Sequence, residues 1–244
     1  MSSDTPVFPW FAPKLSPSMA GVMNGLGHAV TFRRGEVLYE SPGFFPKLMF
    51  VRRGLIVKAM MDAHHEDPLL LSIGGPGSLC GCYETLYLSD RIPRRHWCMT
   101  TAEVLVVNSD LLLRICDQNA HWQREITNYT SLCAMADRYG LLLNHTASLE
   151  ERLAVFFVLC EMQGDPFFQS RLYDESLEWI RLSTVPSRRV VAGIVDTSVE
   201  KLRTVLNSWQ EEDVLRYRSH KLLLRRDRLI RSWHAMQGIL GLSD

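Results

Sequence analysis

The clearest hydrophobic pattern in the chain runs from Ser187 to Trp209 and predicts two short helices joined by a tight turn. Ser187 and Ser198 are good N-caps for the first and the second helix. The first helix repeats apolar residues at helical spacing at Val190, Val191, Ile194 and Val195, and the second at Leu202, Val205, Leu206 and Trp209. The second helix is left with an outward row of Ser198, Glu200, Lys201, Arg203, Thr204 and Asn207. This pattern is typical of a helix-turn-helix and also of an ordinary helical hairpin, so these residues leave both open.

Upstream, from Ala29 to about Ser109, short alternating segments are separated by turn glycines and predict a β-barrel or sandwich, here a jelly roll. The predicted strands are Ala29–Phe32, Val37–Tyr39, Leu48–Arg53, Leu55–Met61, Leu69–Ile73, His96–Thr101 and Ala102–Val107.

A long helical pattern follows from Asn119 to about His145 and carries two apolar rows. The first row consists of Trp122, Ile126, Tyr129, Cys133, Ala136, Gly140 and Leu143. The second row consists of Leu132, Met135, Tyr139 and Leu142. Small residues in the first row would let two helices approach closely. We expect one row to face a partner chain and the other the barrel, although a helix buried on two sides of a monomer is the alternative.

The segments on either side of the helix pair also have recognisable patterns. Ser148 to Glu151 forms a capping box for a helix that reaches about Gln163. After Trp209, the segment Val214–Arg225 predicts a small hairpin turning at Ser219 and His220, and a terminal helix follows. A hairpin directly after the second helix is the arrangement of a winged helix.

Charge changes the interpretation of the helix pair. The 244-residue chain has zero formal net charge, but positions 188–231 hold eleven Lys or Arg against six Asp or Glu. A basic C-terminal part favours nucleic-acid binding. We find no secretory signal, no apolar stretch near the ~20 residues that span a bilayer, and six scattered cysteines, and we therefore expect a cytoplasmic protein without a membrane partner. No nucleophile–base motif or phosphate loop is present, so we do not expect an enzyme.

The order of these parts resembles the Crp/Fnr superfamily of bacterial transcription regulators. The likeness is carried by RRGEVLYESPG at Arg33–Gly43, FVRRGLIVK at Phe50–Lys58, GGPGSLCG at Gly74–Gly81 and the helix pair with its hairpin. It implies an α+β fold with a cyclic-nucleotide-binding-like barrel and a winged helix-turn-helix. The implied divisions are an N-terminal arm at 1–28, an effector-sensing barrel at 29–118, a dimerisation helix and hinge at 119–146, and a DNA-binding domain at 147–244.

The resemblance also implies which residues contact DNA. Glu200 matches the family's recognition-helix glutamate, which accepts from a cytosine amino group. Arg203 and Thr204 occupy the following contact positions, where relatives usually have a small residue and then arginine, so the operator is expected to depart from the usual half-site. The complete expected DNA-binding set is Arg188, Ser198, Glu200, Lys201, Arg203, Thr204, His220 and Lys221.

The effector is less clearly indicated. Gly81 is followed by Cys82 instead of the family's glutamate, which argues against cyclic AMP, whereas Arg94, Arg95 and His96 favour an anionic effector or form a solvated basic loop. By fold analogy, the expected effector-binding residues are Cys82, Tyr83, Glu84, Arg95, Tyr129 and Cys133. Haem through His96, His121 or a cysteine is a weaker alternative, and no metal site is expected. Cys80 and Cys82 are favoured as small buried thiols over a metal or redox pair.

The sequence thus predicts a homodimeric regulator gated by a small molecule, binding a palindromic operator whose half-sites lie about 34 Å apart. RNA polymerase is an implied partner. A haem- or redox-based sensor of the same fold is the first alternative, and a jelly-roll metal enzyme is the second.

Overall fold

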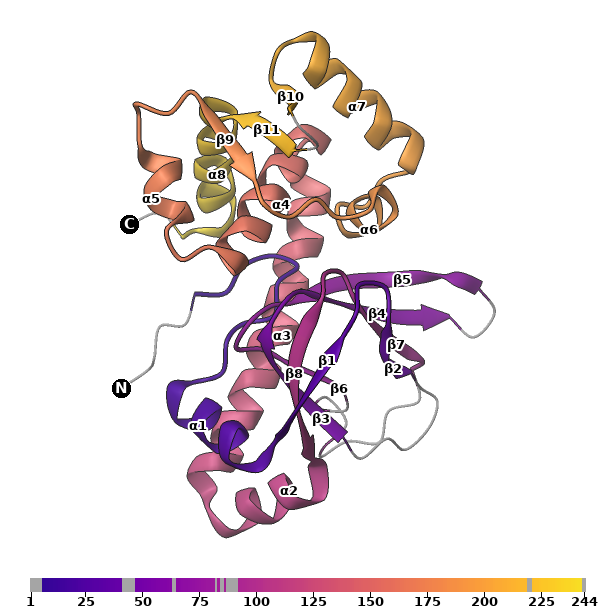
Figure 1. Cartoon of the computed structure of the whole chain (residues 1–244), viewed down its shortest axis with the longest axis vertical. Coiled ribbons are helices and arrows are strands. Elements are labelled where there is room, and N and C mark those ends of the chain that lie inside the picture. The colour runs from indigo at the N-terminus through magenta and orange to yellow at the C-terminus, as the bar shows by residue number, and fades with distance from the viewer. Residues whose placement is uncertain are drawn as a thin grey trace. The chain divides into compact units, whose positions relative to one another are not determined.

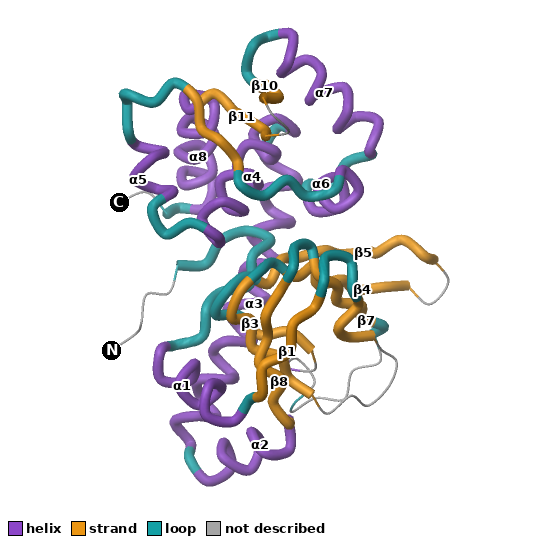
Figure 2. The backbone as a smooth tube through the Cα atoms, viewed as in Figure 1, coloured by secondary structure: helices purple, strands orange, loops and turns teal. Residues whose placement is uncertain are grey.

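The structure, a computed structural model, describes residues 6–40, 47–62, 65–81, 83, 86, 92–218 and 221–242. The chain divides into two compact units, Met1–Arg138 and Tyr139–Asp244. Strands dominate the first unit after a short N-terminal helix, and helices dominate the second (Figures 1 and 2). The expected α+β class is confirmed. No helix in the described part of the chain has the length and hydrophobicity needed to cross a membrane.

Two antiparallel four-stranded sheets form the body of the first unit. One has the order β1 (His28–Phe32), β8 (Ala102–Asn108), β3 (Lys47–Arg53), β6 (Leu79–Gly81). The other has the order β2 (Val37–Glu40), β7 (Arg94–Cys98), β4 (Ile56–Asp62), β5 (His65–Gly74). All seven predicted strands correspond to observed ones. Strand β6 was not predicted, because three residues between glycine turns give too short an alternation to detect.

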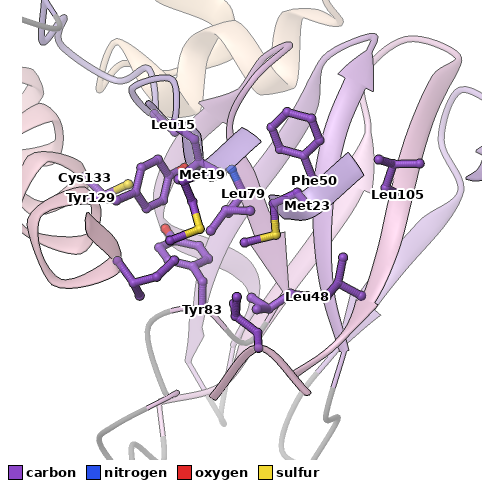
Figure 3. Packing of buried hydrophobic residues seen from close by; sticks show 14 of the residues in the cluster. Leu15, Met19, Met23, Leu48, Phe50, Leu79, Tyr83, Leu105, Tyr129 and Cys133 are labelled. Carbon is purple, nitrogen blue, oxygen red and sulfur yellow. Dashed lines mark hydrogen bonds between the residues drawn. The ribbon is translucent and has the colours of Figure 1, made fainter. Parts of the chain in front are cut away.

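Strands β8, β3 and β6 of the first sheet are buried on both faces, whereas the edge strand β1 is largely exposed. Met49, Val51 and Val104 face the second sheet in a cluster that includes Ile56 and Cys98. The opposite face forms a second cluster with α1 (Pro17–Leu26), α2 (Ser109–Gln118) and α3 (Ala120–Thr146), shown in Figure 3. Helix α2 lies where the sequence predicted only the end of the barrel.

Helix α3 places its two apolar rows in different environments. From Ile126 to Leu143 the first row is buried, and Ile126, Tyr129 and Cys133 belong to the cluster on the sheet. The backbone carbonyl of Ala136 accepts a hydrogen bond from the Trp10 N–H at 3.3 Å. The small residues of the first row therefore pack within this chain, which corrects the expectation that they bring two helices together. The second row is only partly covered, and Leu142 is 43% exposed.

The second unit has the element order of a winged helix. It comprises α4 (Leu149–Gly164), α5 (Phe168–Tyr173), β9 (Trp179–Leu182), α6 (Arg188–Ile194), α7 (Val199–Glu211), β10 (Leu215–Arg218), β11 (Lys221–Arg225) and α8 (Arg226–Leu240). The three strands pair in the order β10–β11–β9. The capping box at Ser148 is present as predicted. Helix α5 and strand β9 lie between α4 and the helix pair.

A buried carboxylate ties α4 to the segment that leads into α6. Glu161 is 1% exposed, and one carboxylate oxygen accepts from the N–H groups of Ser183 and Thr184, both at 2.9 Å. The other oxygen accepts from the Ser183 hydroxyl at 2.7 Å. Glu161 therefore accepts hydrogen bonds from two backbone N–H groups in the segment between β9 and α6, where neither element provides a partner.

We expect Glu161→Ala to lower the free energy of unfolding by about 3 kcal/mol, because a hydrogen bond to a charged group contributes about 1.5–3 kcal/mol. The loss of three such bonds is partly offset, since Ser183 is exposed and Thr184 half-buried, so water can replace the carboxylate at their donors. Glu161→Gln keeps one acceptor oxygen and should lose about half as much. Urea denaturation of the full chain measures both. Glu175→Ala, at an exposed position of the same unit, is the control. A Glu161→Ala variant as stable as this control would contradict the assigned role.

Candidate nucleic-acid interface and barrel cavity

Helices α6 and α7 begin at the two serines that the sequence indicated. The Ser187 hydroxyl accepts from the Val190 N–H at 3.4 Å, and the Ser198 hydroxyl accepts from the Lys201 N–H at 3.2 Å. Between the helices, Asp196 adopts φ +51°, a left-handed conformation that aspartate tolerates better than most residues. The turn expected from the sequence is therefore formed without glycine.

Helix α7 has a buried back and an exposed front. Leu202, Leu206 and Trp209 are buried, and Val205 is half-buried. The Thr204 hydroxyl donates to the Glu200 carbonyl one turn earlier at 3.1 Å, and this bond fixes the orientation of the Thr204 side chain on the helix. The front exposes the predicted residues Ser198, Glu200, Lys201, Arg203 and Thr204.

The outer face of the wing sheet carries positive charge. Register places Arg218 beside Lys221, and Leu223 between Arg216 and Arg181. Arg216 is bonded to Asp213 and lies 4.1 Å from the Trp179 ring centroid. The other three cations are exposed and form no ion pair within the described ranges.

Further features complete this surface. A groove of about 470 Å³ runs along the wing sheet past Trp179 and Gln210. Arg188 is exposed at the first position of α6. His220, the other residue expected at the wing tip, lies outside the described residues.

The C-terminal end of α3 is bonded to the helix pair within the second unit. The Asn144 side-chain amide donates to the Ile194 carbonyl, the last residue of α6, at 3.2 Å. The Arg152 guanidinium, on α4, donates to the Asn144 carbonyl at 2.8 Å. Asn144 therefore links three helices, and the end of α3 and the first helix of the pair form one packed body.

The barrel interior contains a small cavity lined by charged residues. It measures about 20 Å³ and is lined by Lys58, Ala59, Met60, Ser72, Arg94, His96 and Asp137. Lys58 and Arg94 are each 6% exposed, and His96 is 2% exposed. The Lys58 ammonium donates to the Tyr83 hydroxyl at 2.5 Å.

Histidine 96 is held neutral in this cavity. Its burial, followed by the charges of Lys58 and Arg94, lowers its pKa well below the usual value. The Gly81 N–H donates to its Nδ1 at 3.1 Å, which leaves Nε2 to carry the ring proton. The side chain is therefore a hydrogen-bond donor without charge.

Three of the expected effector residues lie together beside this cavity. The rings of Tyr83 and Tyr129 meet edge to face at 5.6 Å, and the Tyr129 hydroxyl accepts from the Leu79 N–H at 2.7 Å (Figure 3). Cys133 is buried on the same helix in the same cluster. Arg95 instead lies on the exposed side of β7, 3.7 Å from Glu40. Cys82 and Glu84 lie outside the described residues.

The five described cysteines are buried, and burial keeps four of them protonated. Burial raises the pKa of Cys80 to about 12 and that of Cys98 to about 11, and it also raises the pKa values of Cys133 and Cys160. A protonated thiol is a poor nucleophile and metal ligand. Among the described residues, no three His, Cys, Asp or Glu side chains are placed to hold a metal ion together.

Lys58, Ser72 and Asp137 were missed by the sequence analysis. Lys58 did carry a signal, since it interrupts an otherwise apolar strand between Val57 and Ala59. Asp137 belongs to neither apolar row of the long helix, and its neighbours in the sequence do not distinguish it. Only the three-dimensional packing brings it to the cavity.

Comparison with known proteins agrees with this architecture. No family model and no curated protein sequence matches the chain. FixK2 from Bradyrhizobium japonicum has a similar structure, with a TM-score of 0.61 and 18% identity, over 84% of this chain and 96% of that one. A transcriptional regulator of the Crp/Fnr family from Eubacterium rectale gives a TM-score of 0.63 at 11% identity, over 90% and 95% of the two chains.

A third similar structure is the c-di-GMP-responsive global regulator CLP from Xanthomonas campestris. Its TM-score is 0.61 at 14% identity, over 86% of this chain and 99% of that one. The resemblance stated from the sequence is thus confirmed in the fold, and the chain has the two-part architecture of the Crp/Fnr regulators.

Proposed function

We propose that this protein is a sequence-specific DNA-binding transcription regulator of the Crp/Fnr type. The observation that carries the proposal is α7, which has a capped start and an exposed polar front and is followed in the chain by a wing with a basic outer face. A duplex supplies phosphates for the cations and base edges for the helix front. The likeness to regulators of this architecture supports the same role.

Within this proposal the exposed residues divide into two kinds of contact. Glu200 accepts from a cytosine amino group, and Arg203 donates to guanine in the major groove. Arg188, Lys201 and Lys221 bind phosphates, which fixes the register on the duplex without specifying sequence. His220 joins the phosphate contacts in the proposed set, and Ser198 and Thr204 contribute hydroxyl groups at the start and the front of α7.

The second row of α3 is the proposed dimer interface. Leu132, Met135 and Tyr139 are half-buried and Leu142 is exposed, so a second copy of this helix would cover them. Alternating spacings of three and four are those of a two-stranded coiled coil. A dimer of this kind presents two α7 helices to a palindromic operator.

The barrel is the proposed sensor. Tyr83, Tyr129 and Cys133 stand between the sheet and α3, where a bound effector would change how the helix packs. CLP is described as responsive to c-di-GMP, which illustrates an effector-controlled protein of this architecture. The cavity of about 20 Å³ is too small for a nucleotide in the present state, in keeping with the departure from the cyclic AMP cassette.

A haem- or redox-based sensor remains the alternative within this fold. The raised pKa values of the Cys80 and Cys98 thiols argue against rapid oxidation of these two cysteines. His96 already accepts a hydrogen bond at Nδ1, which leaves Nε2 as the atom that a haem iron would need. An absorption spectrum of the purified protein distinguishes haem from an organic effector. We place the regulator in the cytoplasm, with RNA polymerase as its partner at promoters.

Selection from a random duplex library with the purified protein should enrich a palindromic motif, and two variants should then separate the kinds of contact. Arg188→Ala should weaken operator and random DNA alike and reduce the salt slope by about 0.9. Glu200→Ala should lose about 1–3 kcal/mol of discrimination at one position of each half-site. Fluorescence anisotropy at several salt concentrations measures both effects.

The control for this pair is Glu211→Ala, an exposed position at the far end of α7, which should bind like the parent. Binding to selected and random duplexes with equal affinity would contradict the proposed function.

Leu142→Glu should raise the dimer dissociation constant by about 100-fold or more, because each dimer loses two buried leucines and gains two buried carboxylates. Analytical ultracentrifugation measures the change. Ala134→Glu, which is exposed on another side of α3, should leave the dimer intact. Equal dissociation constants for the two variants would show that the second row is not the interface.

A further inference from the structure

The charged lining of the barrel cavity is built by one face of three neighbouring strands and by α3. In the β7–β4–β5 register, Lys58 stands directly opposite Ser72 on one side and His96 on the other. Arg94, two residues before His96, pairs with Met60 and shares the same face. These side chains therefore converge inside the barrel, and the one that reaches them from outside the sheet is Asp137 of α3.

The described lining contains two cations, one carboxylate, one neutral histidine and one hydroxyl group. Burying a charge is costly unless an opposite charge or hydrogen bonds compensate it. Lys58 obtains part of this compensation from Tyr83, whose ring centroid lies 4.6 Å from its ammonium group. Nε2 of His96 and the Ser72 hydroxyl supply neutral donors. This donor set suits a carboxylate or another small monoanion.

The size of the cavity decides how such an anion could enter. About 20 Å³ accommodates roughly one water molecule, since a water needs at least about 10–15 Å³. A ligand larger than water must therefore displace a lining group. Among the lining residues, Asp137 is the one on a separate element, and its replacement by another carboxylate conserves the charge.

We propose that Asp137 acts as an internal substitute for the effector, and that a small organic monoanion, a carboxylate in the simplest case, binds Lys58 and Arg94 in its place. The exchange releases α3 from the second sheet. The dimer row lies on the same helix, with Met135 and Tyr139 two residues to either side of Asp137. Binding in the barrel therefore shifts the packing of the proposed dimer interface. This inference rests on the proposed function for its gating role, whereas the anion site itself does not.

The experiment titrates the full-length protein with sodium acetate and sodium benzoate, without DNA, at constant sodium concentration balanced with HEPES. Calorimetric melting curves give each affinity, because a ligand that binds the folded state raises Tm with its concentration. Removing the competing charge in Asp137→Asn should tighten at least one of the two anions by about tenfold or more. Lys58→Met and Arg94→Met should weaken that anion by a similar factor.

The matched control is Arg95→Met, because Arg95 adjoins Arg94 in β7 but lies on the exposed side of the strand. It should bind anions like the parent. Arg94→Gln, which keeps a hydrogen-bond donor without charge, provides a second test should the methionine variants fold poorly. Anion affinities in Asp137→Asn no higher than in the parent, or unaffected by loss of both Lys58 and Arg94, would overturn the proposal.

Gating is tested separately by DNA binding. Asp137→Asn should shift the DNA affinity in the same direction as the anion does in the parent protein. One outcome is that the anion binds as expected while Asp137→Asn and the parent bind the same duplex with equal affinity. That result would contradict the proposed release of α3. If the parent binds no duplex at all, the proposed function fails while the anion site stands.

Discussion

Much of this molecule depends on how α3 is fixed to the barrel. The Tyr129 hydroxyl accepts from the Leu79 N–H on β6, a strand at the edge of its sheet, so the helix satisfies a backbone donor that the sheet leaves open. Burial raises the pKa of Tyr129 well above its usual value, and the hydroxyl stays protonated. With Tyr129 fixed, the first row faces inward and the second row remains for another contact.

The barrel has an unusual interior for a sheet sandwich. One part of this interior is apolar, where Ile56 and Cys98 cluster with Val104. Two residues further along the same strands, the inward positions carry Lys58 and His96. Charges placed so deep contribute little to stability when paired and destabilise when left alone. Folding stability therefore does not explain their presence in the core, whereas the proposed anion site does.

Much of the architecture could be predicted from the sequence because it depends on local patterns of residues. Serine caps, period-two strands and the hairpin after Trp209 each depend on a few consecutive residues, and the structure contains all of them. The assignment of the two rows of α3 could not be made in this way. Both rows are apolar, and only the packing of Tyr129 and Cys133 on the sheet decides between them. Asp137 was missed for the same reason.

In the proposed regulator, the end of α3 suggests how a change in the barrel would reach the helix pair α6–α7. Asp137 and Asn144 are seven residues apart, so on a continuous α-helix they lie on nearly the same side, about 10 Å apart. Asn144 is bonded to Ile194 of α6 and receives the Arg152 guanidinium of α4. A rotation of this part of α3 must therefore carry the helix pair with it or break these bonds. A joint movement of α3 and the helix pair keeps these hydrogen bonds intact. In the proposed regulator we therefore expect α3 and α6 to move together, joined by the hydrogen bond of the Asn144 side chain.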